Sequence, residues 1–450
     1  MKKIKNKNKK AWIIAADMGY GHQRAAFPLK YLSGGRIINA NNYPGIPKED
    51  RRWWQEGREF YEFISRFKGV PLIGDAVFNF YDRLQSIPTF YPHRDLSRPN
   101  AQVRQIDYLI RKKNWGRHLI NKLGQDPVPL ITSFFVPALM ADAFRYPGHI
   151  YCLATDTDIS RAWVSAKPSQ SRINYLAPSY RVVERLRLYG VPAERIFLTG
   201  FPLPVDNLGD VHLGLLQEDI RHRIKNLDTK GSYWRQYQGV FKQYIKPAHL
   251  PKKSNHPLTL TFAVGGAGAQ RELGAAILFG LRHKIKQGRI RLVLVAGIHN
   301  DVARYFQESA HKAGLGQALK EKDVIIISAP DKYAYFNKFD KILRTTDILW
   351  TKPSELSFYV ALGIPLIMSE PIGSQEKFNR IWVDTIGAGT DQLDPEFVEE
   401  WLFDLLDSGW LAEAAMEGFI EAPKYGTFNI EKVISGQQDE VKELKTVLQF

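Results

Sequence analysis

A histidine follows the first hydrophobic run of the chain after only a few residues. The run Ala11–Ala16 leads into Asp17-Met-Gly-Tyr-Gly-His22, and an amphipathic stretch begins at the histidine. Gly19 and Gly21 allow a sharp turn and a close approach of backbone to ligand, and the N–H groups of a following helix would attract an anion. A neutral His22 imidazole could take a proton from an attacking hydroxyl. A histidine that only hydrogen-bonds within its own turn explains the local sequence equally well.

A second glycine-rich turn opens the later part of the chain. Val264–Glu272 reads VGGAGAQRE and follows a hydrophobic run directly. It lacks the Gly-Lys-Ser/Thr of a Walker loop, and no acidic residue follows at the spacing of a dinucleotide-binding turn. Contact between Gly265, Gly266, Gly268 and a diphosphate is favoured over a purely structural turn, and Arg271 could add positive charge.

A third group of polar residues surrounds two later hydrophobic runs. Pro353 and Ser354 are typical of a helix start, and the helix is expected to run to about Gly363. A glutamate in a first turn can simply complement the helix dipole. Gln375 and Asn379 are four residues apart, so on a helix they share a face and could bind one polyhydroxylated ligand. The candidates of this group are Lys352, Ser354, Glu355, Gln375, Glu376 and Asn379.

Alternating hydrophobic runs and amphipathic stretches must position these residues. This alternation is typical of βαβ units and parallel sheets. The first series of predicted strands is Ala11–Ala16, Arg36–Ala40, Val128–Thr132, His149–Thr155, Arg172–Ala177 and Arg195–Thr199. The second series is Leu258–Val264, Arg291–Gly297, Val324–Ser328, Asp347–Thr351 and Ile364–Ser369, and the last eighty residues are predicted to be helical throughout.

The fold class expected from this pattern is α/β, with two facing Rossmann-like domains. The N-terminal Rossmann-like domain would span 11–205, and its strand pattern lapses at Phe201-Pro-Leu-Pro204. The polar segment 206–256 shows no strand pattern and is interpreted as a helical insertion followed by a linker. A second Rossmann-like domain would occupy 257–425, and a C-terminal helix in 426–450 would pack back toward the first domain.

Composition excludes several classes of protein. A chain of 450 residues with 44% hydrophobic and 24% charged residues is expected to be globular, with two or three domains. No apolar run is long enough to cross a bilayer. Six lysines stand in the first ten residues, but the apolar run behind them is too short for a signal peptide. A cytoplasmic location is therefore expected, and the single Cys152 suits a reducing compartment.

The formal net charge of +15 is expected to attract an anionic partner. The sequence has no recognisable nucleic-acid module, so phosphates of a substrate and anionic lipids are better candidates than nucleic acid. No cluster of metal ligands at characteristic spacing is present, and neither a metal nor another cofactor is expected.

Together the motifs resemble one family, the GT-B glycosyltransferases. This family includes monogalactosyldiacylglycerol synthases, processive diacylglycerol glucosyltransferases and the peptidoglycan N-acetylglucosaminyltransferase. Order and spacing are kept over roughly residues 11–205 and 257–385, and six matches in order are a specific signal. The matching segments are Gly19-Tyr-Gly-His22, Thr155-Asp156 with Trp163, Thr199-Gly-Phe-Pro202, Gly265-Gly-Ala-Gly268, Thr351-Lys352 with Gly363-Ile-Pro365, and Ser374-Gln-Glu-Lys-Phe-Asn379.

The resemblance implies an inverting, metal-independent transfer of a sugar from a nucleotide-diphosphate donor to a hydroxyl acceptor, which could be a lipid. His22 would be the general base and Asp156 an acceptor-side or orienting group. Gly19, Gly21 and Trp163 would also lie on the acceptor side. The C-terminal half would bind the donor through Gly265, Gly266, Gly268, Arg271, Lys352, Ser354, Glu355, Gln375, Glu376 and Asn379, and the turn's N–H groups would stabilise the leaving diphosphate.

Three positions depart from the pattern of the family. The glutamate that binds the nucleotide ribose falls on Phe358, and Glu355, one helical turn earlier, is the candidate substitute. The histidine that often precedes the tryptophan falls on Ser160, and the glycine of Gly-Gln-Glu falls on Ser374. Two alternatives therefore stay open: a nucleotide-sugar epimerase or hydrolase on the same fold, and a catalytically inactive nucleotide-sugar-binding protein.

Two basic stretches with tryptophan bear on association with a membrane. Arg51–Lys68 has Trp53, Phe60, Ile64 and Phe67 near helical spacing, and Arg111–His118 contains Trp115. Basic amphipathic helices can lie on anionic membranes, which would make the protein peripherally membrane-associated. Two helices that pack on the first sheet are the favoured interpretation, since a covering helix needs the same apolar stripe.

Overall fold

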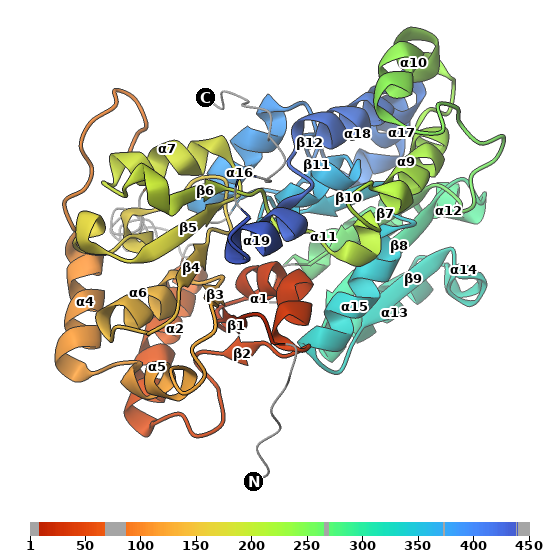
Figure 1. Cartoon of the computed structure of the whole chain (residues 1–450). Helices are drawn as coiled ribbons and strands as arrows, with labels where there is room; N and C mark the ends of the chain where they lie inside the picture. Colours follow the sequence, from red (N-terminus) through yellow and green to blue (C-terminus); the bar gives the residue numbers. More distant parts are fainter. Residues whose placement is uncertain (1–8, 68–86, 265–269, 372–373, 438, 440–450) are drawn as a thin grey trace. The chain divides into compact units, whose positions relative to one another are not determined.

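Two parallel six-stranded sheets form the framework of the chain (Figure 1). The computed structural model describes residues 9–67, 87–264, 270–371, 374–437 and 439. Contacts divide the chain into two units. The first comprises Met1–Pro202, Ile372–Asn379 and Tyr425–Phe450, and the second comprises Leu203–Pro371 and Arg380–Lys424. Each unit contains one sheet with its helices, so the predicted α/β class with two Rossmann-like domains is confirmed.

The first sheet has the strand order β2-β1-β3-β4-β5-β6, and all of its pairs are parallel. Each of the six predicted runs contains a strand. From β1 the chain turns to β2 on one side, and then crosses to β3 on the other side. The sheet therefore has its topological switch point between β1 and β3, where ligands of such sheets bind. The strands are β1 Trp12–Ala15, β2 Ile38–Asn39, β3 Leu130–Thr132, β4 Ile150–Leu153, β5 Ile173–Ala177 and β6 Ile196–Leu198.

The helices of the first unit bury one tryptophan of each basic stretch, while Trp53 is half-buried and packs against the same core. Trp54 is 5% exposed and Trp115 is 6% exposed, and their rings meet edge to face at 4.9 Å. These two tryptophans are part of the core and are not surface anchors, while side chains 58–67 lie outside the described set. The helical elements of this unit are α1 Tyr20–Ala26, η1 Phe27–Ser33, α2 Lys48–Phe67, α4 Ala101–Lys113, α5 Arg117–Leu123, α6 Phe135–Ala143, η2 Arg161–Trp163, η3 Pro168–Gln170, α7 Tyr180–Leu188, η4 Ala193–Arg195 and α19 Gly426–Ile434.

Helix α19 packs on the first unit although it follows the second unit in the sequence. Asn429 Nδ2 donates to the Thr199 carbonyl at 3.0 Å, and Glu431 bonds Lys10 and Tyr31. A Cβ atom on Gly426 would lie 2.0 Å from the carbonyl oxygen of Phe201, so only glycine permits this close approach. Residues 438 and 440–450 of the predicted C-terminal helix lie outside the described residues.

The second sheet has the strand order β12-β11-β10-β7-β8-β9 and is also parallel. The chain runs from β7 to β8 and β9 on one side and then crosses to β10 on the other side. The switch point therefore lies between β7 and β10. The strands are β7 Thr259–Ala263, β8 Arg291–Gly297, β9 Val324–Ser328, β10 Ile348–Thr351, β11 Leu366–Met368 and β12 Gly389–Asp391.

Strand β12 shows that the prediction of helix throughout the last eighty residues was wrong. Leu366 of β11 pairs with Gly389, and Met368 pairs with Asp391. The strand reads Gly-Thr-Asp and lies at the edge of the sheet. Because such a short polar edge strand carries no run of β-branched or aromatic residues, the sequence gives no strand signal there.

The helices of the second unit include the polar segment for which no strand was predicted. That segment contains α8 Val205–Leu208, α9 Gly214–Leu227 and α10 Ser232–Tyr244. The remaining helical elements are α11 Arg271–Gly280, α12 Arg282–Lys286, α13 Asn300–Lys312, α14 Gly316–Glu321, α15 Lys332–Leu343, η5 Glu355–Leu362, η6 Pro395–Phe397, α17 Val398–Ser408 and α18 Trp410–Glu421, together with the part of α16 Ser374–Thr385 that follows Asn379.

Arg223 anchors α9 to the rest of the second unit. Its side chain is 1% exposed and donates to three backbone carbonyls, those of Thr346 at 2.7 Å, Leu362 at 2.7 Å and Leu343 at 3.1 Å. Leu343 and Leu362 are the last residues of α15 and η5, where carbonyls have no partner within the helix. Burial lowers the pKa of the Arg223 guanidinium, and the charge of Asp347 opposes this effect.

We predict that Arg223→Met destabilises the second unit strongly. Methionine fills similar space but donates no hydrogen bond, so three buried carbonyls would lose their partner at about 1–3 kcal/mol each. The free energy of unfolding in urea should fall by at least ~2 kcal/mol. Lys225→Met, on the exposed face of the same helix, should change it by less than about 0.5 kcal/mol. Equal effects of the two substitutions would contradict the anchoring role.

Candidate functional site

His22 lies at the switch point of the first sheet. It follows β1, and Ser133 follows the neighbouring β3. His22 Nδ1 lies 2.8 Å from the Ser133 carbonyl oxygen, and Ser133 Oγ donates to the His22 carbonyl at 2.5 Å. Gly19 precedes α1 with φ of 121°, a conformation that L side chains rarely adopt. The first turn of α1 and the loop after β3 are thus joined at the switch point through both residues.

This hydrogen bond determines which nitrogen of the imidazole can act as a base. A backbone carbonyl only accepts, so Nδ1 must carry the hydrogen. In the neutral ring the lone pair is then on Nε2. The ring is half-buried, packs edge-on against Phe134 with centroids 4.6 Å apart, and lies 6.2 Å from the ring of Trp163. His22 is therefore held in the tautomer that a general base requires.

The turn after β4 brings Asp156 next to this histidine. Thr155 Oγ1 lies 3.4 Å from His22 Nδ1 and 3.4 Å from Asp156 Oδ2. Because Nδ1 is already a donor, the Thr155 hydroxyl is oriented to donate toward the carboxylate. His22, Thr155 and Asp156 thus form one polar cluster in the first unit, as expected from the order of the strands that carry them.

Two residues beyond Asp156, a buried carboxylate fixes the turn to α7. Asp158 is fully buried and accepts from Arg185 Nε at 2.8 Å, from Arg185 Nη2 at 2.9 Å and from Arg181 Nε at 2.9 Å. Arg185 is also fully buried, and the Arg181 guanidinium lies 3.7 Å from the centroid of Phe90. Removing one charge from such a buried network strongly destabilises the folded state.

The predicted acceptor-side tryptophan is part of an aromatic wall. Trp163 is 5% exposed and lies 5.3 Å from the ring of Phe135, the first residue of α6. Ser160, where the resembled family often has a histidine, is buried and precedes the 3₁₀ turn of Arg161–Trp163. The described rings of this group are those of Trp163, Phe135, Phe134 and His22, and the imidazole of His22 is the one imidazole among them.

The second switch point carries the glycine-rich turn. Gly265, Gly266 and Gly268 lie outside the described residues. Gln270, directly before α11, has φ of 71°, and its Oε1 accepts from Ser369 Oγ at 3.2 Å. Ser369 follows β11, so this bond joins the loops that follow β7 and β11.

Arg271 does not offer an unpaired charge at this turn. Its Nε lies 2.9 Å from Glu272 Oε1, its Nη1 lies 3.8 Å from Asp301 Oδ2, and its guanidinium lies 5.1 Å from the centroid of Tyr305. Two carboxylates therefore lie next to the charge of Arg271.

The loop after β10 presents the next predicted group. Lys352 and Ser354 are half-buried, and Glu355 is 8% exposed at the start of η5. Phe358 is 1% exposed, and its ring lies 5.3 Å from that of Trp382. Phe358 is thus a core residue, and the carboxylate closest to it along η5 is Glu355.

The predicted residues of α16 separate into two groups. Gln375 and Glu376 in the first turn are half-buried. Asn379 is fully buried and belongs by its contacts to the first unit, where its amide binds Asp156 and Thr157. The structure thus brings Asn379 together with Asp156, two residues that the sequence had assigned to opposite halves of the reaction.

Ser133 and Phe134 were missed in the sequence, although a signal was present. The segment Thr132-Ser-Phe-Phe135 directly follows a predicted strand. Once β3 is placed next to β1, the rule that ligands bind at the switch point indicates this segment as part of the site.

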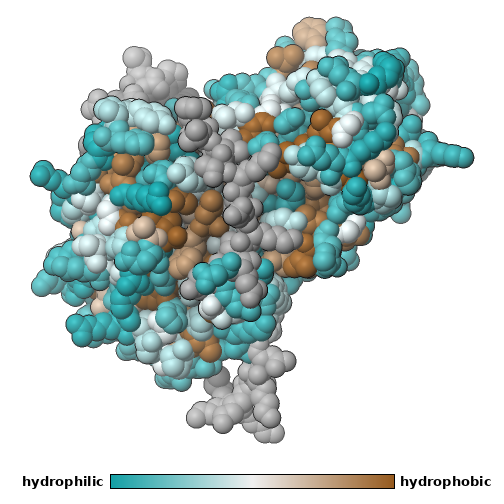
Figure 2. All heavy atoms as spheres, turned by 45° about the horizontal axis from the view of Figure 1, so that its top comes forward, coloured by the Kyte–Doolittle hydropathy of each residue, from teal (hydrophilic) through white to brown (hydrophobic). Residues whose placement is uncertain are grey.

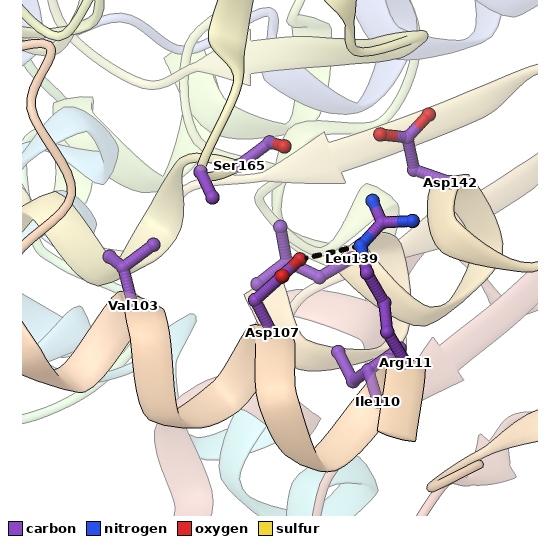
Figure 3. A pocket seen from close by; sticks show the side chains of 8 residues that line it. Val103, Asp107, Ile110, Arg111, Leu139, Asp142 and Ser165 are labelled. Carbon is purple, nitrogen blue, oxygen red and sulfur yellow. Dashed lines mark hydrogen bonds and ion pairs between the residues drawn. The ribbon is translucent and has the colours of Figure 1, made fainter. Parts of the chain in front are cut away.

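A pocket on the first unit lies at the C-terminal end of α6, opposite to the end that begins with Phe135 (Figure 3). Asp107, Arg111 and Asp142 line it, together with Val103, Ile110, Leu139, Ser165 and Ala166. Asp107 and Arg111 pair at 2.8 Å, and Asp142 accepts from the backbone N–H of Arg172 at 3.0 Å. Its charges are thus satisfied by the protein, and Asp142 lies in the last turn of the helix whose first residue packs on Trp163.

The surface gives no sign of a membrane span. On the face drawn in Figure 2, hydrophilic side chains predominate and hydrophobic ones form patches. Among the described residues, no helix combines the length and the apolar character needed to cross a membrane.

Comparison with known proteins gives one partial family match. A model described as a domain of unknown function (DUF6938) matches residues 249–429. No curated protein matches the sequence.

Similar solved structures include S. aureus MnaA with UDP, at 12% identity and a TM-score of 0.44 over 97% of this chain and 99% of that chain. The UDP-GlcNAc 2-epimerase of Neisseria meningitidis bound to UDP-GlcNAc is 14% identical, with a TM-score of 0.43 over 95% and 98%. Acinetobacter baumannii MurG is 13% identical, with a TM-score of 0.42 over 95% and 99%. Likenesses at this level assign no reaction, which must be argued from the residues of this chain.

We predict that Asp158→Asn destabilises the first unit. The substitution keeps the shape of the side chain but removes the charge that pairs with the fully buried Arg185 guanidinium, which costs about 3–5 kcal/mol in comparable pairs. Urea denaturation followed by circular dichroism measures the loss. The control is Asp107→Asn, which breaks a solvent-exposed ion pair with Arg111 and should cost less than about 1 kcal/mol. A loss for Asp158→Asn as small as that of the control would refute the network's contribution.

Proposed function

We propose that the chain is a nucleotide-sugar enzyme that transfers the sugar to a hydroxyl acceptor, with His22 as the general base. The observation that carries the proposal is the hydrogen bond between His22 Nδ1 and the Ser133 carbonyl. It joins the first turn of α1 to the loop after β3 at the switch point of the first sheet and puts the lone pair of the neutral imidazole on Nε2.

In the first unit, Nε2 of His22 removes the proton of the acceptor hydroxyl as its oxygen attacks the anomeric carbon. The imidazolium that forms is favoured by the nearby carboxylate of Asp156, which Thr155 links to the ring. Trp163 and Phe134 provide aromatic surface beside the imidazole, which suits the apolar face of a sugar or of another acceptor carrier. A positioned base of this kind contributes about 10²–10⁴-fold to the rate.

In the second unit, the turn after β7 binds the diphosphate. Two carboxylates lie next to the charge of Arg271, and in this proposal the backbone N–H groups of Gly265–Gly268 and the start of α11 stabilise the leaving group. Glu355 accepts from the ribose hydroxyls in place of the glutamate that falls on Phe358. Lys352 and Ser354 of this unit also belong to the donor site, to which the resemblance assigns Gln375 and Glu376 as well.

A thermal-shift panel with UDP, GDP, ADP, TDP and CMP tests donor binding. A nucleotide at 100 times its dissociation constant should stabilise the protein by about 2.7 kcal/mol. The shift should weaken in Gln375→Ala and persist in His22→Ala, because only the first of these residues belongs to the donor site. Absence of a shift with every nucleotide would overturn the proposal.

The nucleotide that binds is then offered as its sugar conjugate, with and without a panel of hydroxyl acceptors. Release of nucleotide that requires an acceptor and is reduced at least ~100-fold in His22→Ala supports the transferase. Release without acceptor, or conversion to an epimer, would replace it by a hydrolase or an epimerase. Binding without any turnover would make the chain a binding protein.

A further inference from the structure

The side chain of Asn379 reaches two successive residues of the turn that carries Asp156. Its Oδ1 accepts from the Thr157 backbone N–H at 2.9 Å and from Thr157 Oγ1 at 3.0 Å. Its Nδ2 donates to Asp156 Oδ1 at 3.1 Å. Asn379 is fully buried, and all three residues belong to the first unit.

The donors on Thr157 fix the orientation of this amide. A backbone N–H can only donate, so the atom of Asn379 that faces it must be the oxygen. The NH₂ group then faces Asp156, whose oxygen must be the acceptor. The amide therefore binds Asp156 through Oδ1, while Oδ2 lies toward Thr155.

Other contacts fix the backbone of the turn. Ser179 Oγ donates to the Thr157 carbonyl at 3.1 Å, and Asp158 is bound by Arg181 and Arg185. These contacts hold the turn against α7 but leave the Asp156 carboxylate to be oriented by groups that reach it directly. Asn379 is such a group, and it orients the oxygen that faces Thr155 and His22.

We propose that Asn379 is a positioning residue, which holds the ionised Asp156 carboxylate toward His22 through Thr155, and that it does not bind the donor sugar. The proposal rests on the proposed function, in which Asp156 favours the protonated base. It assigns to Asn379 a role in the catalytic step, whereas a ligand-binding role would affect the affinity for substrate.

A double-mutant cycle tests the contact without any measurement of activity. Asn379→Asp keeps an oxygen for both Thr157 donors but sets a carboxylate against Asp156. Two carboxylates at this distance repel, so the variant should unfold at lower urea concentration, and the deficit should shrink as the pH falls and one of the pair is protonated. Adding Asp156→Asn restores a donor–acceptor pair in reverse and should recover the stability. Failure of the second substitution to rescue the first would overturn the contact.

Kinetics of the same variants test the role. Asn379→Asp should lower kcat about 10- to 100-fold with the KM for the donor within twofold of wild type, and should move the acidic limb of the pH–rate profile upward. The rescued double variant should regain stability but not kcat, because the charge has moved from position 156 to position 379. Lys377→Ala, on the exposed side of α16, should leave both parameters unchanged.

The outcomes separate the two proposals. A rise in donor KM with unchanged kcat would show that Asn379 binds the ligand and would overturn the positioning role. A wild-type chain that binds nucleotide but turns over no sugar conjugate would overturn both the proposed function and the catalytic role of Asn379. In that case rescue of stability in the double variant would still identify the Asp156–Asn379 pair as structural.

Discussion

The hydrogen bond between the His22 imidazole and the Ser133 carbonyl depends on the order of strands in the first sheet. More than a hundred residues separate the two partners in the sequence. They meet because β3 lies directly beside β1, while β2 lies on the other side of β1. The segments that follow β1 and β3 therefore leave the sheet next to each other before they diverge. The same order places the turn after β4 next in line, which brings Thr155 and Asp156 to the histidine. The chemistry of the ring, including its tautomer, is thus a consequence of sheet topology.

Strand positions could be predicted well because buried parallel strands carry a strong signal. Runs such as Arg291–Gly297 are apolar on both faces, since helices cover both sides of the sheet. The short edge strand β12 has no such requirement and was missed. The sequence of the polar segment around α9 indicates its helices but not how they are attached to the second unit. That attachment is one buried arginine, which caps the ends of α15 and η5. Nothing in the sequence distinguishes Arg223 from the exposed Lys225 of the same helix.

The site was predictable where a residue follows a strand, and unpredictable where its partner lies far away in the chain. His22 and Asp156 were found because they stand a few residues beyond the ends of β1 and β4. The pairing of Asp156 with Asn379 was not predicted, since helix periodicity shows which face of α16 Asn379 occupies but not what that face meets. The position of Asp301 next to the charge of Arg271 was invisible for the same reason. Packing on the first sheet was the favoured interpretation of the stretch around Trp115, whose basic neighbours also suited a membrane surface, and its ring packs on Trp54 in the core.

The first unit contains residues that the ribosome adds only after nearly all of the second. Gly426 packs against the carbonyl of Phe201, and Asn429 binds the carbonyl of Thr199, at the point where the chain first leaves this unit. During synthesis the surface of the first unit that α19 contacts therefore stays uncovered while the second unit is being made. This chain therefore cannot complete the folding of its first unit before synthesis of the second unit begins, as strictly vectorial folding would require. The unit that contains His22 can be complete only when the polypeptide has been synthesised at least as far as α19.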